Sequence, residues 1–92
     1  MGGGGVPSGG TYITEGRNLK PIGKPNSRVD RYQNGIKVQS RWYGPDGKAR
    51  RNRDYRHQDA HQNHTFPHDH KWDWTKNTPR IPNNLPPDFR YN

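Results

Sequence analysis

The fold is decided by residues 27–55, which read SRVDRYQNGIKVQSRWYGPDGKARRNRDY. Two runs rich in β-branched, aromatic and long polar side chains, residues 27–33 and 36–43, are separated by Asn34-Gly35. An Asn-Gly pair between two such runs is the strongest short-range signal for a β-hairpin, because the tight turn needs a positive φ at both central residues. The stretch therefore predicts a hairpin that turns at Asn34-Gly35.

The simplest register of this hairpin pairs Gln33 with Ile36, Arg31 with Val38, and Val29 with Ser40. Side chains alternate between the two faces of a strand, so this register predicts one apolar face and one polar, cationic face. The apolar face would carry Val29, Ile36, Val38 and Trp42. The opposite face would carry Arg28, Asp30, Tyr32, Lys37, Gln39, Arg41 and Tyr43.

A second turn is predicted at Gly44-Pro45-Asp46-Gly47. Proline fits the first central position of a type I turn, and glycine fits the left-handed position that follows. A third strand over residues 48–55 then returns antiparallel, and a bulge at Gly47 would shift its register by one. We therefore expect a mostly β protein, a small twisted antiparallel sheet with a three-stranded meander at its centre and loop-rich flanks.

Length and composition allow one small domain at most, because the chain has 92 residues and only 24% of them are apolar. We expect a flexible Gly-rich lead over residues 1–10 and a single small basic domain over residues 11–92. Within this domain, the sheet covers residues 27–55, a His-rich segment covers 54–70, and a Pro-rich tail covers 77–92. Three Trp, five Tyr and two Phe predict a thin aromatic core.

The flanks of the meander give weaker structural signals. Residues 11–26 predict one short strand or a strap packed on the core. Trp72 and Trp74 alternate with Asp73, which is compatible with a short fourth strand, and the two indoles fit the core better than a base-stacking role. The Pro-rich tail should be extended and anchored by its few apolar side chains.

The formal net charge of +8 and the pI near 10.2 indicate a polyanionic partner. Residues 27–56 carry nine Lys and Arg against three acids, whereas residues 57–76 carry two Lys against three acids. The chain has no cysteine, which excludes disulfides and Cys-ligated zinc. No apolar run reaches transmembrane length and no secretion signal is evident, so we expect no membrane partner.

All five histidines lie in the His-rich segment, next to the basic block: His57, His61, His64, His68 and His70. Imidazole titrates near neutral pH, so a pair of histidines suits general acid–base cleavage of a phosphodiester. In the scheme that we favour, His57 pairs with His68 or His70 to move the protons. Asp54 or Asp59 would orient an imidazole, and Arg41, Arg50, Arg51 or Arg53 would stabilise the transition state.

The predicted catalytic residues are therefore Asp54, His57, His68, His70 and Arg41, without a cofactor, whereas His61 and His64 are interpreted as spectators. Contacts to nucleic acid are assigned to a basic and aromatic set: Arg28, Arg31, Tyr32, Lys37, Tyr43, Lys48, Arg50, Arg51 and Arg53. Three alternatives remain open, one of which is a structural or inhibitory interaction protein whose basic face covers an acidic protein groove. A His/Asp cluster that includes His68 and His70 would bind a divalent metal that activates water, or the chain would bind nucleic acid without cleaving it.

The span from Arg28 to about Arg80 resembles a domain found at the C-terminal end of bacterial polymorphic toxins and of some prophage-encoded proteins. The runs that carry this resemblance are Val29-Asp30-Arg31-Tyr32, Asn34-Gly35, Arg41-Trp42-Tyr43, Asp46-Gly47-Lys48-Ala49, Asp54-Tyr55-Arg56-His57, Phe66-Pro67-His68-Asp69-His70 and Trp72-Asp73-Trp74. The resemblance implies a toxin that acts in the bacterial cytoplasm of the producer or target cell. It also implies a cognate immunity protein, which would be acidic because the chain is basic.

The stretch Asp54-Tyr55-Arg56-His57 is also similar to the Asp-Tyr-x-His stretch in the active site of the ribosome-inactivating colicin ribonucleases. Those domains are small, basic, Cys-free antiparallel sheets that cleave 16S rRNA without a metal. The catalytic Glu of that family has no counterpart here, because Glu15 is the only Glu, so Asp59 or another histidine would replace it. The resemblance implies a metal-independent endoribonuclease that cleaves rRNA or tRNA, with roles for Asp54 and His57.

Overall fold

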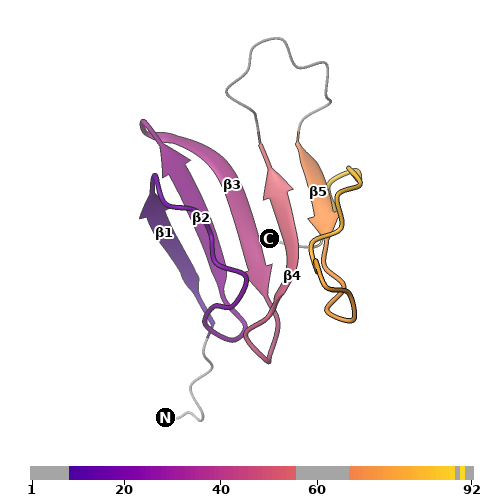
Figure 1. Ribbon diagram of the computed structural model, residues 1–92. Helices are drawn as coiled ribbons and strands as arrows, with labels where there is room; N and C mark the ends of the chain where they lie inside the picture. Colours follow the sequence, from indigo (N-terminus) through magenta and orange to yellow (C-terminus); the bar gives the residue numbers. More distant parts are fainter. Residues whose placement is uncertain (1–8, 56–66, 89, 91–92) are drawn as a thin grey trace, which may run out of the picture.

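The computed structural model describes residues 9–55, 67–88 and 90. In these residues five strands form one sheet in the order β1-β2-β3-β4-β5, without a helix (Figure 1). The strands are β1 (Thr11–Glu15), β2 (Arg28–Gln33), β3 (Ile36–Tyr43), β4 (Ala49–Asp54) and β5 (His68–Lys71). The predicted β class and the central meander β2-β3-β4 are confirmed. The sheet is mixed rather than wholly antiparallel, because β1 pairs with β2 in parallel.

Both predicted turns are present. Asn34 and Gly35 have φ values of 53° and 78°, as the two-residue turn requires, and Gln33 pairs with Ile36 as expected. At the second turn the Gly47 amide donates to the Gly44 carbonyl at 2.9 Å, and Gly47 has a φ of 80°. Glycine adopts this left-handed conformation without steric cost, so the turn delivers the chain directly into β4.

The rest of the predicted hairpin register is wrong. A bulge between Arg31 and Tyr32 shifts the pairing by one, so Arg31 faces Gln39 and Val29 faces Arg41. A shift of one residue moves side chains to the other face of the sheet. The predicted apolar face is therefore not formed, since Val29 and Trp42 lie on opposite sides.

The observed register divides the sheet into two faces. The histidine face carries Tyr12, Thr14, Val29, Arg31, Gln39, Arg41, Asn52, Asp54, His68 and His70. The arginine face carries Thr11, Ile13, Arg28, Asp30, Ser40, Trp42, Arg51, Arg53, Asp69 and Lys71. Each face thus carries both basic and acidic side chains. Any charged side chain that is buried on either face needs a partner of opposite charge or a hydrogen bond.

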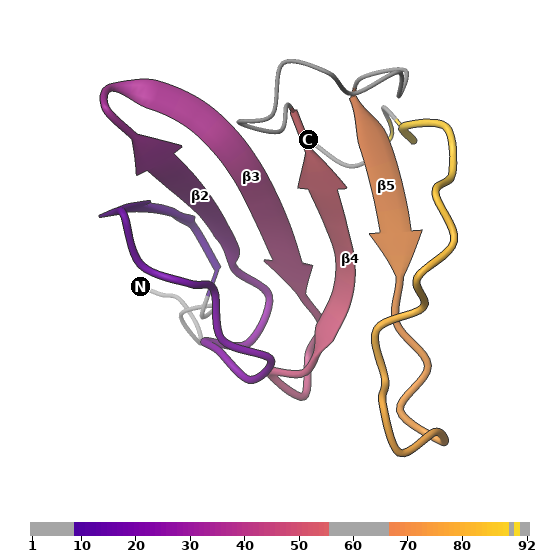
Figure 2. The same ribbon diagram turned by 45° about the horizontal axis from the view of Figure 1, so that its top comes forward.

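Two connections cover this sheet. Residues 16–27 return from β1 to β2 across the histidine face, where Arg41 and Tyr43 donate to the carbonyls of Leu19 and Lys20. After β5 the chain turns and runs back along the outer edge of the sheet (Figure 2). In this C-terminal strap, residues 72–88, Trp72 pairs with Arg80. Leu85 of the strap pairs with Asp69 of β5, so backbone groups on the outer edge of β5 gain hydrogen-bond partners.

The interior of the described part is mostly polar. Its buried apolar residues are Trp42, Tyr43 and Ala49. The buried polar and charged residues are Ser27, Asp30, Ser40, Arg41, Arg51, Asn52, Arg53, Asp54, His68, Asp69 and His70. Removing one partner of such a network leaves an uncompensated buried group, so the fold depends on complete pairing. No helix in the described ranges is long and apolar enough to cross a membrane.

Candidate active site

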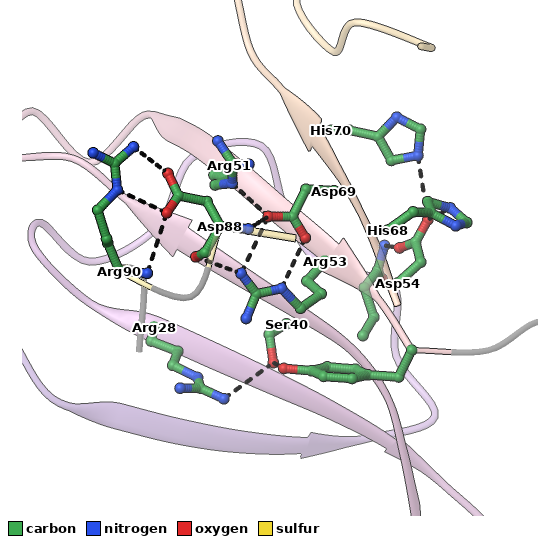
Figure 3. A network of polar contacts seen from close by, with 12 residues as sticks. Arg28, Ser40, Arg51, Arg53, Asp54, His68, Asp69, His70, Asp88 and Arg90 are labelled. Carbon is green, nitrogen blue, oxygen red and sulfur yellow. Dashed lines mark hydrogen bonds and ion pairs between the residues drawn. The ribbon is translucent and has the colours of Figure 1, made fainter. Parts of the chain in front are cut away.

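A carboxylate and two imidazoles meet where β4 ends and β5 begins (Figure 3). Asp54 Oδ2 lies 3.3 Å from His68 Nε2 and 3.4 Å from His70 Nε2. All three residues are buried, with 8%, 5% and 3% of their surfaces exposed. We call Asp54, His68 and His70 the Asp–His cluster.

The sheet register builds this cluster. Asp54 is the cross-strand partner of His68, and Asn52 is the partner of His70. His68 and His70 are two residues apart on one strand, so their side chains lie on the same face. The sequence prediction named all three members as catalytic candidates, and the structure brings them together on the histidine face.

Two hydrogen bonds fix the orientation of the cluster. Gln39, the partner of Asp54 on β3, donates from Nε2 to Asp54 Oδ1 at 2.9 Å, which leaves Oδ2 facing the histidines. His70 Nδ1 lies 3.0 Å from the Ile81 carbonyl of the strap. A carbonyl oxygen only accepts, so Nδ1 carries the hydrogen and the neutral His70 ring presents the lone pair of Nε2 to Asp54.

Arg80 adds a cation beside the cluster. Its Nη2 atom lies 3.9 Å from Asp54 Oδ2, and 40% of its side chain is exposed. Burial and the positive charge of Arg80 lower the pKa of His70 below its ordinary value of 6.5, which favours the neutral ring. The sequence prediction missed Arg80, because pairings that no local pattern indicates bring the strap to this place, such as Trp72 with Arg80 and Lys71 with Ile81.

Arg41, the predicted catalytic arginine, is engaged elsewhere. Its Nη1 atom donates to the carbonyls of Leu19 at 2.8 Å and Lys20 at 3.2 Å, and its guanidinium lies 4.8 Å from the Trp72 ring centroid. Burial lowers its pKa, and the nearby charge of Arg80 lowers it further. Arg41 therefore ties the sheet to the β1–β2 connection, and Arg80 is the cation nearest the cluster carboxylate that the structure describes.

A second charged network lies on the arginine face (Figure 3). The carboxylate of Asp69, fully buried, accepts hydrogen bonds from Arg51 Nε at 2.6 Å, Arg53 Nε at 2.8 Å and the Asp88 amide at 2.9 Å. Burial alone would raise the pKa of Asp69, but the bonds from Arg53, the Asp88 amide and Arg51 lower it below 3.8. Arg51 and Arg53, assigned from sequence to RNA, thus hold β4 against β5.

The other residues assigned to nucleic acid have different exposures. Tyr43 is buried and bonded to the Lys20 carbonyl, which removes its ring from any stacking surface. Arg28 pairs with Asp30 at 2.8 Å on the arginine face. Of the remaining members, Arg31, Tyr32 and Lys37 are half-buried. Lys48 and Arg50 are exposed. Arg31 lies on the histidine face opposite Gln39.

The two indoles of the strap pack on the sheet. Trp72 and Trp74 stack with ring centroids 5.7 Å apart. The Nε1 atom of Trp72 donates to Asn52 Oδ1, and that of Trp74 donates to the Ala49 carbonyl, both at 2.7 Å. Both indoles are half-buried, so they pack on the sheet but are not part of the buried core that the sequence favoured for them. His57, Asp59, His61 and His64 lie outside the described residues.

Comparisons of the chain with protein-family models, with curated proteins and with solved structures found no match. Its function is therefore inferred from its own residues and geometry.

Proposed function

We propose that this domain is an endoribonuclease of the bacterial toxin type, which cleaves rRNA or tRNA at the Asp–His cluster. The observation that carries the proposal is the convergence of Asp54, His68 and His70 beside Arg80, on a strongly basic domain. Neighbouring titratable groups held in distinct environments are typical of catalytic sites. A purely structural ion pair would not require two imidazoles at one carboxylate oxygen.

RNA supplies its own nucleophile for this chemistry. The ribose 2′ oxygen attacks the adjacent phosphorus and forms a 2′,3′-cyclic phosphate, while the bond from phosphorus to the 5′ oxygen breaks. The cluster takes the proton of the 2′-hydroxyl, and a proton is delivered to the leaving 5′ oxygen. Arg80 is near enough to Asp54 to neutralise charge that develops on the phosphate.

The sequence adds His57 to this scheme through its position in Asp54-Tyr55-Arg56-His57. In the proposal His57 serves as the second proton carrier from outside the cluster. The net charge of +8 supports two further parts of the proposal: RNA as the polyanionic substrate and an acidic immunity protein as the protective partner. The site of action is the cytoplasm of a target or producer cell, where these RNAs occur.

Incubation of the purified full chain with total bacterial RNA tests the proposal, with cleavage ends mapped and assayed for 2′,3′-cyclic phosphate. We expect discrete cleavage by the native chain and by His64→Gln, a matched control from the same His-rich segment. His70→Gln and His57→Ala should both abolish cleavage while leaving RNA affinity nearly unchanged. RNA binding without cleavage by the folded native chain would instead support a non-enzymatic nucleic-acid-binding protein.

A further inference from the structure

The Asp–His cluster has an electrostatic conflict in its centre. In the neutral ring, the Nδ1 hydrogen that His70 donates to the Ile81 carbonyl leaves a lone pair on Nε2. That lone pair faces Asp54 Oδ2 at 3.4 Å, and a carboxylate oxygen also offers only lone pairs. Two buried acceptors that face each other repel, and a cation between them converts this repulsion into attraction.

Two of the three distances between ligand atoms in the cluster match those around one metal ion. Zinc bonds to imidazole nitrogen and carboxylate oxygen of about 2.0–2.1 Å, at tetrahedral angles, place neighbouring ligand atoms about 3.3–3.4 Å apart. The two measured separations from Asp54 Oδ2 are 3.3 Å to His68 and 3.4 Å to His70. One ligand atom from each of the three residues lies within 4.8 Å of the other two. A rotation of the imidazole side chains would bring the ligand nitrogens of His68 and His70 to the same spacing.

The hydrogen bonds around the cluster are those that surround metal ligands. A metal-bound histidine typically donates its other ring hydrogen to a carbonyl or carboxylate, and bound carboxylates are themselves hydrogen-bonded. His70 makes the first kind of bond to Ile81, and Asp54 receives the second from Gln39 at 2.9 Å. Both supports lie on segments other than the strands that carry the ligands, so the donor atoms are oriented before an ion arrives.

We infer that Asp54 Oδ2, His68 Nε2 and His70 Nε2 bind one divalent transition-metal ion, with zinc as the best match. Two imidazoles and one carboxylate suit zinc and its transition-metal neighbours, whereas magnesium and calcium prefer oxygen ligands alone. Three protein ligands leave a coordination position for water, as in catalytic zinc sites. The inference takes up the metal-binding alternative that the sequence left open, in place of the metal-free scheme that it favoured.

The binding itself is independent of the proposed function, whereas the catalytic role of the ion rests on it. In that role a metal-bound hydroxide would take the proton of the 2′-hydroxyl and become bound water, while His57 would deliver the proton to the leaving 5′ oxygen. Arg80 competes with the ion for Asp54 Oδ2 at 3.9 Å. Its exposed side chain can turn to solvent when the ion binds, so Arg80→Gln should raise the affinity for zinc.

Metal binding is tested on the full chain after treatment with a chelator and dialysis. Zinc is titrated calorimetrically, and cobalt is titrated by its visible absorption, which reports tetrahedral coordination. We expect one ion per chain and a rise in the melting temperature with zinc. His68→Gln, His70→Gln and Asp54→Asn should each weaken binding by about 100-fold or more, since even supporting residues cost about 10–100-fold. The matched controls His61→Gln and His64→Gln should bind like the native chain.

X-ray absorption of the zinc-loaded native chain keeps the test decisive if a variant fails to fold. Two imidazoles and one carboxylate at zinc would support the inference. Absence of zinc and cobalt binding, binding that survives all three ligand substitutions, or binding that is lost in His61→Gln and His64→Gln would overturn it. RNA cleavage with and without EDTA separates the two proposals. Cleavage that persists in EDTA rejects a catalytic role for the ion but keeps the nuclease. Tight zinc binding without cleavage keeps the metal site but rejects the nuclease.

Discussion

Asp54 and His68 are cross-strand partners in the ladder between β4 and β5, and Asp54 Oδ2 lies 3.3 Å from His68 Nε2. His70 reaches the same oxygen from two positions further along β5. Backbone pairing, rather than a loop, therefore sets the distances in the cluster. Substitutions that keep the shape of a side chain should change its chemistry without disturbing the sheet.

Asp54→Asn should lower RNA cleavage by about 100-fold or more, the usual scale for loss of a proton-transfer system. The amide keeps an oxygen that can accept the hydrogen bond from Gln39, so the fold and the RNA affinity should change little. Initial cleavage rates and gel retardation measure the two effects. Asp46→Asn is the control, because Asp46 caps the exposed turn at the Lys48 amide. Full activity of Asp54→Asn would remove the cluster from the reaction.

Asp69→Asn should destabilise the fold by about 3–5 kcal/mol, because it removes the buried carboxylate charge that the two buried guanidiniums share. The exposed fractions of the Arg51, Arg53 and Asp69 side chains are 8%, 6% and 0%, so solvent cannot replace the carboxylate. Urea unfolding followed by Trp fluorescence gives the free energy of unfolding. Asp73→Asn is the control in the strap turn and should behave like the native chain. A loss under about 1 kcal/mol would mean that this network contributes no more than a surface ion pair.

Gly47→Ala should destabilise the protein more than Gly35→Ala does. Both glycines have a positive φ, 80° and 78°, so each substitution incurs about 1–2 kcal/mol of backbone strain. A Cβ atom at Gly47 would also lie 2.7 Å from the Gly23 carbonyl oxygen, whereas one at Gly35 meets nothing within 4 Å. The difference between their free energies of unfolding isolates this clash. Equal losses would show that the contact with Gly23 yields without cost.

The elements of this fold were predictable where a turn required a particular residue. Asn34-Gly35 and the turn that ends at Gly47 placed β2, β3 and β4 along the chain. The register was not predictable, because Val29 is the only aliphatic residue of β2 and the strand lacks the clear apolar period that would fix it. The bulge near Arg31 therefore reversed the expected faces.

The candidate site shows the same division between local and distant information. His68 and His70 share a face through local spacing, and the sequence marked both, with Asp54, as catalytic candidates. Arg51 and Arg53 look like RNA-binding cations in sequence, since their counter-charge Asp69 is more than a dozen residues away. Arg80 lies beside Asp54 because the strap returns along β5, and no local sequence pattern predicts that return.

Arg31 and Arg80 lie on the histidine face, near Gln39 and Asp54 respectively, where a phosphate backbone would cross the cluster. Arg31→Gln and Arg80→Gln should each weaken RNA binding by a similar factor for all sequences. Each should also reduce the slope of log affinity against log salt concentration by about 0.7, as expected for one lost contact to single-stranded RNA. Fluorescence anisotropy of a labelled oligoribonucleotide across a salt series measures both quantities.

Arg90→Gln is the control, because Arg90 is highly exposed and pairs with Asp88. The backbone of Asp88 contacts Arg53 and Asp69 of the arginine face. An unchanged slope in Arg31→Gln and Arg80→Gln, with a reduced slope in Arg90→Gln, would move the RNA path to the arginine face.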